Sequence, residues 1–198
     1  MTVESRKPMR LISMFSEILP LLVLFIGNSV YNIFIGAAAS VICTMLVLAI
    51  TWLLEHRIAR FALFSATLSF CFTLAAIWLG ESLFIKIQPT LFNGLFAFVL
   101  LGGWLRGAAM MKQFFGAQFT LPNDVWKTLS LRWGIFFLCL ALANEWAWRS
   151  LSDDGWVAYK VLVASPATAA FMLAQLPITL RGSREAKMAE IKTKANKI

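Results

Sequence analysis

The chain has 198 residues, of which 60% are apolar and only 14% are charged, and its mean hydropathy is +0.75. A soluble globular domain is about 45–50% apolar and about 25% charged, so this composition excludes a water-soluble fold and indicates an integral membrane protein. The net charge of +8 is explained by basic residues near membrane surfaces. We predict no nucleic-acid partner, because no basic run is interleaved with aromatic residues.

Six apolar segments approach the roughly 20 residues that a membrane-spanning helix needs. In chain order they are residues 11–30, 33–54, 61–80, 91–105, 131–148 and 157–180. The first segment contains Glu17 and Pro20, and a carboxylate in the middle of a spanning helix costs about 2.5–3.5 kcal/mol. We therefore predict an all-α polytopic transmembrane bundle with six crossings. A version with five crossings stays open, in which the first segment is interfacial or re-entrant.

The distribution of Lys and Arg predicts the orientation of this bundle. If the N-terminus is cytoplasmic and all six segments cross, only Lys86, Arg149 and Lys160 lie outside. Residues 1–10 then form a cytoplasmic tail, residues 11–180 the bundle, and residues 181–198 a basic cytoplasmic tail near anionic lipid headgroups. Residues 28–32, 81–89 and 149–155 form short polar connections, of which we place the last two outside.

The stretch LPNDVWKTLSLRW, residues 121–133, interrupts the apolar pattern with polar residues. Pro122 suits the first position of a helix, and Asp124 suits its first turn, where the helix dipole favours a carboxylate. An apolar residue recurs at every fourth position, at Leu121, Val125, Leu129 and Trp133. Together with Trp126 and Arg132, this pattern is typical of a short interfacial helix near 121–130 that anchors the chain to the cytoplasmic membrane surface. We favour this anchor over a specific partner or ligand site.

Candidate chemistry is sparse. Cys43, Cys71 and Cys139 fall in three separate apolar segments, and His56 is the only histidine, so neither a disulfide framework nor a zinc motif is indicated. Asp153 and Asp154 are adjacent, and neighbouring side chains point apart on any regular element. No arrangement of nucleophile, base and orienting group is visible. We therefore predict a protein that is not an enzyme, with no catalytic residue, cofactor or metal.

The remaining polar residues of the apolar segments have structural and functional interpretations. Glu17 with Pro20 marks either a broken helix lining a cavity or a carboxylate at headgroup depth. Asn93 caps the fourth segment or bonds to a neighbouring helix, Asn144 lies near the outer end of the fifth, and Lys160 extends outward from the sixth.

Two alternative functions stay open. The first is a small transporter or lipid-handling protein in which Glu17, Asn32 and Asn93 face a cavity at the broken first helix. The second is a membrane enzyme acting on a lipid-linked envelope precursor, which needs carboxylates or His56 to converge in one pocket.

Several blocks of the sequence resemble the septation protein A family, the inner membrane-spanning YciB proteins of bacteria. These blocks are FSEILPLLVLF, YNIFIGAAAS, FIKIQPTLFNGLFAFVLLGG, LPNDVWKTLSLRWGIFF and ANEWAWRSLSDDGWVAYKV, spread over residues 14–180. The chain departs from the family where Glu17 and Asn32 stand in place of a frequent Asp, and where Gln88 stands in place of Lys or Arg.

The resemblance implies a multi-pass protein of the bacterial inner (plasma) membrane that supports cell division, septum formation and cell-envelope integrity without established catalysis. It also implies membrane-protein partners of the division and elongation machinery, and it leaves open a homo-oligomer. Family members are often drawn with five crossings. The residues that we expect to fix helix ends or to present a partner surface are Glu17, Asn32, Lys86, Pro89, Asn93, Pro122, Asp124, Trp126, Arg132, Trp133, Asn144, Trp156 and Lys160. Of these, we place Lys86 and Pro89 in the outer loop.

Overall fold

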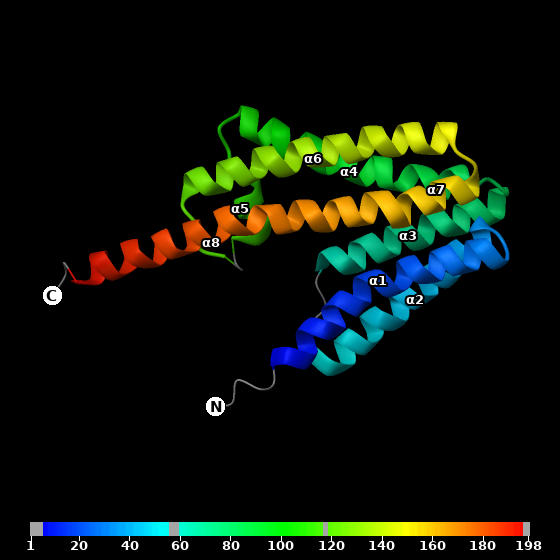
Figure 1. The fold of residues 1–198 in the computed structure, drawn as a ribbon, viewed down its shortest axis with the longest axis horizontal. Coiled ribbons are helices and arrows are strands. Elements are labelled where there is room, and N and C mark those ends of the chain that lie inside the picture. The colour runs from blue at the N-terminus through cyan, green and yellow to red at the C-terminus, as the bar shows by residue number, and fades with distance from the viewer. Residues whose placement is uncertain (1–5, 56–59, 117–118, 196–198) are drawn as a thin grey trace. The chain divides into compact units, whose positions relative to one another are not determined.

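The structure, a computed structural model, describes residues 6–55, 60–116 and 119–195. It describes the side chains of residues 18–53, 63, 65–116, 119–189, 191 and 192. In chain order the elements are α1 (Arg6–Val30), α2 (Ile33–Glu55), α3 (Arg60–Leu79), α4 (Leu83–Leu105), α5 (Met110–Phe115), α6 (Asn123–Ser150), α7 (Asp153–Tyr159), the π-helical stretch η2 (Lys160–Ala164) and α8 (Ser165–Ala195) (Figure 1). The described part contains no strand, so the predicted all-α fold is confirmed.

Each of the first five predicted apolar segments lies largely in one helix, and the sixth extends over α7, η2 and α8. Among the described residues, four helical stretches are long and apolar enough to cross a bilayer: Ile33–Leu53, Leu83–Leu105, Asn123–Ser150 and Asp153–Ala189. Ile18–Val30 and Ser65–Leu79 are shorter apolar helices. The chain is therefore a helical membrane bundle.

The chain divides into two compact units. Unit 1 contains Met1–Gln88 and Trp146–Val163, and unit 2 contains Pro89–Glu145 and Ala164–Ile198. Each unit has its own cluster of buried apolar residues.

In unit 1, α1 packs on α2, α2 packs on α3, and α7 contacts both α1 and α2. The backbones of α1 and α2 touch at Gly27 and Gly36, where a Cβ atom added to Gly27 would lie only 2.7 Å from the Gly36 Cα. The core next to this crossing consists of Leu24, Ile33, Ala37, Ala76, Ile85, Ala147, Trp156 and Val157. Small residues at the crossing thus allow two membrane helices to approach closely, as is common in bilayers.

The first helix is not broken, contrary to one of our two interpretations of Glu17 and Pro20. α1 runs from Arg6 to Val30 and continues through Pro20. The Pro20 carbonyl accepts a hydrogen bond of 2.8 Å from the Ser40 hydroxyl of α2, which ties this part of α1 to its neighbour. Proline within a helix is tolerated more readily in membrane helices, where neighbouring helices pack against the chain.

The structure corrects the position of Lys86 and Pro89. Both lie inside α4, which begins at Leu83, and not in a loop. The Ser82 carbonyl accepts hydrogen bonds from the backbone N–H groups of Ile85 and Lys86, at 3.0 and 3.1 Å, so the first turn forms before Pro89 is reached. Pro89, which we had placed in the outer loop, is incorporated within the second turn of the helix.

In unit 2, the predicted interfacial helix near 121–130 is not a separate element. Residues 123–150 form the single helix α6. The four-residue periodicity identified an apolar face, but this face is covered by protein and not by lipid: Trp126 is only 2% exposed. The cluster around it contains Leu100, Met111, Leu121, Val125 and Leu129, with Ile178 of α8 packed against it.

The short helix α5 is attached to α6 by a buried serine. Ala109 precedes α5 and offers no side-chain cap, so the first N–H groups of the helix need another acceptor. Ser130, which is fully buried, accepts a hydrogen bond of 3.0 Å from the Met111 N–H and donates one of 2.8 Å to the Trp126 carbonyl. The hydroxyl therefore caps one helix from the side of another.

Candidate functional site: a polar network on α7

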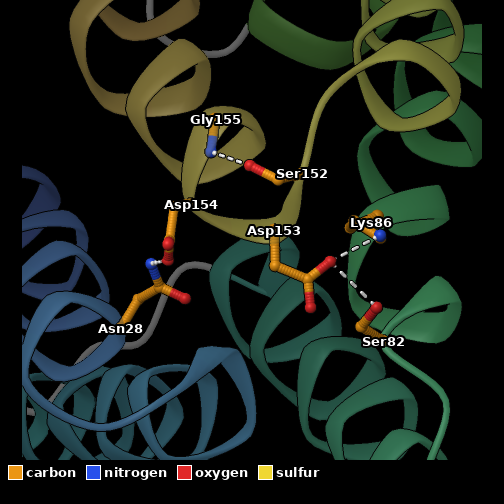
Figure 2. A network of polar contacts seen from close by, with 7 residues as sticks. All are labelled: Asn28, Ser82, Lys86, Ser152, Asp153, Asp154 and Gly155. Atoms are coloured by element: carbon orange, nitrogen blue, oxygen red, sulfur yellow. Dashed lines mark hydrogen bonds and ion pairs between the residues drawn. The ribbon is translucent and has the colours of Figure 1, made fainter.

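The polar network of unit 1 starts from the cap of α7. The Ser152 hydroxyl accepts a hydrogen bond of 3.2 Å from the Gly155 N–H, which places Asp153 and Asp154 in the first turn of the helix. Carboxylates are stabilised in this position by the helix dipole. Figure 2 shows that the two adjacent aspartates point to different sides.

Asp153 joins α7 to the beginning of α4. Its Oδ1 accepts a hydrogen bond of 2.7 Å from the Lys86 ammonium and one of 3.1 Å from the Ser82 hydroxyl (Figure 2). The Lys86 side chain is 12% exposed and that of Asp153 is 38% exposed, so the ion pair is partly removed from water. A pair in this position is stronger than one on an open surface, because less solvent screens it.

Asp154 joins α7 to the last turns of α1. Its Oδ1 accepts a hydrogen bond of 2.7 Å from the Asn28 amide nitrogen (Figure 2). Asn28 is only 6% exposed, and its Oδ1 atom is buried without a hydrogen-bond partner among the described residues. Such an atom costs about 1–3 kcal/mol. Asn28 is therefore a weak point for stability in an otherwise satisfied network.

Trp156 lies one turn below the aspartates and is fully buried in the core of unit 1. The Lys160 ammonium lies 5.1 Å from the centre of its ring, within cation–π range. Lys160 also begins η2, a π-helical turn that precedes Pro166. A proline ring conflicts with a carbonyl of the preceding turn, and widening that turn relieves the conflict.

In unit 2, Asn144 takes part in a second group of polar contacts. Asn144 is 4% exposed, and its amide nitrogen donates to the Thr90 hydroxyl at 2.8 Å. The Thr90 hydroxyl in turn lies 3.5 Å from an oxygen of Glu145. Hydrogen bonds of this kind between polar side chains hold membrane helices, here α4 and α6, together.

Arg132 and Trp133 attach α6 to α8. The Arg132 guanidinium donates to the side-chain oxygen of Gln175 at 3.3 Å. Trp133 lies edge-on to Phe171, with 5.0 Å between ring centres, and Phe136 stacks on the same Phe171 at 4.0 Å. The two predicted residues thus contact a neighbouring helix.

The other predicted residues lie at helix ends or within helices. Asn32 is exposed and caps α2, since its Oδ1 accepts a hydrogen bond of 3.0 Å from the Ile35 N–H. The Pro122 carbonyl accepts a hydrogen bond from Trp126, Asp124 is exposed in the first turn of α6, and Asn93 is half-buried in α4. The Glu17 side chain and His56 lie outside the described residues.

Sequence reasoning missed Asn28, Ser82 and Ser152, and it dismissed Asp153 and Asp154 as a pair. One signal could have found them. In a bundle of alternating helices, the polar connections at 28–32, 81–89 and 149–155 all fall at the same end. Residues near these connections are the ones that α7 joins.

The network joins helices of unit 1. Both aspartates are occupied by partners in the same unit, and among the residues that the structure describes no three His, Cys, Asp or Glu side chains come together. What the geometry defines is a polytopic helical membrane protein whose polar side chains fasten helix ends to one another.

This protein belongs to the intracellular septation protein A family, whose sequence model matches residues 12–186. A relative from Sinorhizobium fredii, named inner membrane-spanning protein YciB, is 36% identical over 96% of this chain and 99% of its own length. The proteins of the same name from Agrobacterium fabrum and Brucella melitensis are 39% and 37% identical over 77% and 80% of this chain, and over 75% and 79% of their own lengths. No solved structure matches the chain. The relatives and the apolar helices agree on a multi-pass protein of the inner membrane.

Proposed function

We propose that this protein supports septum formation and cell-envelope integrity in bacteria by binding other membrane proteins, and not by catalysis. The observation that carries the proposal is the match of residues 12–186 to the septation family, which includes nearly all of the helical bundle. The names of the family and of its relatives are not enzyme names. The partners that fit this role are membrane proteins of the division and elongation machinery.

The proposed topology has six crossings with both termini in the cytoplasm. The charge distribution supports it, because Lys86, Arg149 and Lys160 are then the only Lys and Arg residues assigned to the outer half. The α7 network would then face the periplasm. Alkaline phosphatase fused before Met1 or after Arg184 should be inactive, and active phosphatase at the N-terminus would refute six crossings.

A partner surface has to be built from exposed residues, and the start of α6 offers two of the predicted ones. Asp124 and Arg132 are exposed, whereas Trp126 is buried and cannot contact a partner. A photo-crosslinking amino acid at Asp124 in living cells should capture a protein of the division or elongation machinery. The control carries the same photo-crosslinking amino acid at Leu142, which is exposed and lies closer to the C-terminal end of α6. Capture of lipid alone at both positions would defeat the proposed surface.

The role in septation is tested in the bacterium that encodes the protein. Deletion of the gene should lengthen cells or misplace septa and should increase sensitivity to detergents, and the wild-type chain should restore both. Normal septum spacing and a normal envelope after deletion would overturn the proposal. A purified protein that turned over an envelope precursor would overturn the non-catalytic part alone.

A further inference from the structure

The end of α8 carries an apolar stripe on the side away from the core of unit 2. Gly182 marks the side that packs, because a Cβ atom added to it would lie 3.1 and 3.2 Å from the two methyl groups of Val125. An α-helix turns by about 100° per residue, so Leu180, Met188 and Ile191 share one side, roughly opposite Gly182. These three side chains are 56%, 64% and 65% exposed.

Cationic side chains border this stripe. Arg184 lies between the apolar residues, Lys187 lies along one edge, and Arg181 and Lys192 lie along the other, by the same helical spacing. All four are exposed, and Glu185 lies further round the helix. A shallow hollow of about 340 Å³ runs beside Met188, lined by Arg184, Glu185, Met188, Ala189 and Lys192. We call the seven residues Leu180, Arg181, Arg184, Lys187, Met188, Ile191 and Lys192 the tail face.

We infer that the tail face binds the anionic phospholipid headgroups of the bilayer that α8 spans. Lys and Arg side chains that lie beside exposed apolar residues can extend along them to reach headgroup phosphates while the apolar residues contact the acyl boundary. The four cations meet lipid phosphates, while Met188 and Ile191 reach the acyl boundary. α8 is one continuous helix from Ser165 to Ala195, and the Gly182–Ser183 pair within it is a sequence at which a helix can bend towards the headgroups.

Charge decides between lipid and a second copy of the chain as the occupant. Two tail faces packed against each other would bring eight cationic side chains together at a desolvated contact, and like charges there are unfavourable. An anionic leaflet offers the opposite charge, and the tail remains next to it because α8 is itself membrane-spanning. The tail face is therefore a lipid site and not a dimer contact.

Purified full-length protein in nanodiscs tests the inference. Cys43, Cys71 and Cys139 are free thiols and are replaced by Ala, after which Met188→Cys or Ile191→Cys carries an environment-sensitive fluorophore. Ala189→Cys is the matched control, because Ala189 is also exposed but lies about 100° from Met188 around the helix. Discs of phosphatidylcholine alone are compared with discs that contain phosphatidylglycerol, at one protein per disc.

We expect blue-shifted, brighter emission at positions 188 and 191 in anionic discs only, with no change at position 189. Replacing Arg181, Arg184, Lys187 and Lys192 by Gln should lower the lipid-bound fraction at least about tenfold. Equal emission in the two kinds of disc, or an equal response at position 189, would overturn the inference. A response that needs two proteins per disc would overturn it in favour of a second copy. Because lipid binding is measured on purified protein, its failure would leave the septation role intact.

Discussion

Replacing Gly36 by alanine should force α1 and α2 apart at their closest point. The added Cβ atom would lie 2.7 Å from the Asn28 backbone nitrogen and 2.8 Å from the Leu24 carbonyl oxygen. Comfortable contacts between heavy atoms are about 3.5–4.0 Å, so the helices must separate by nearly 1 Å here, and backbone atoms cannot rotate away as a flexible side chain would. Overpacking of this kind costs about 1–3 kcal/mol, against a gain in helix propensity of at most about 1 kcal/mol.

The assay is unfolding of the purified protein by sodium dodecyl sulfate in mixed micelles, followed by circular dichroism. Gly36→Ala should unfold at lower detergent fraction than the wild type. Gly94→Ala is the control, because a Cβ atom at Gly94 has no neighbour within 4 Å, and this variant should be as stable as the wild type or more stable. Gly27→Ala strains the same crossing, so the two α1–α2 substitutions should not be additive. A Gly36→Ala protein at least as stable as Gly94→Ala would refute the close approach of the two backbones.

Two further contacts have their own tests. A double-mutant cycle of Lys86→Met and Asp153→Asn should give a coupling of about 1 kcal/mol, modest because Asp153 is more than a third exposed, and no measurable coupling would show that the pair does not join α4 to α7. Ser130→Ala removes the acceptor of the Met111 N–H and should destabilise unit 2 by about 1–3 kcal/mol, with faster hydrogen exchange at that amide. Thr128→Ala is its control, since the Thr128 hydroxyl donates to the Asp124 carbonyl of its own helix. Unchanged exchange at Met111 in Ser130→Ala would contradict the cap.

The sequence predicted the all-α fold and the six apolar segments because both depend on local composition and length. It was wrong about residues 81–89, which were placed in an outer loop, because the apolar segment was expected to begin at residue 91 whereas α4 already begins at Leu83, next to the Ser82 carbonyl that accepts its first hydrogen bonds. It also went wrong at Trp126, where periodicity shows that a face is apolar but cannot show whether lipid or α8 covers it. The α7 network was missed because its contacts join distant parts of the chain. Asn28 and Asp154 are 126 positions apart, and no local sequence pattern encodes the packing that brings them together.

Substitutions at Asn28 can show whether the α7 network contributes to stability or to function. Its Oδ1 atom is buried without a partner among the described residues, so its amide costs part of what the bond to Asp154 contributes. Asn28→Leu removes the buried polar group, and the exposed Asp154 then bonds to water, so stability should stay equal or rise by about 1 kcal/mol. Asp154→Ala should instead leave the whole amide unpaired and destabilise by about 1–3 kcal/mol, and adding Asn28→Leu should reverse this loss.

The outcome that would refute this reasoning is an Asn28→Leu protein less stable than Asp154→Ala in the same detergent titration. If Asn28→Leu is the more stable of the two variants, as predicted, its ability to complement a deletion of the gene separates the structural role of the network from a functional one. A stable Asn28→Leu protein that restores normal septa shows that Asn28 only joins α1 to α7. A stable protein that fails to restore them shows that the septation role needs the buried amide for something other than stability, because the fold then forms without it.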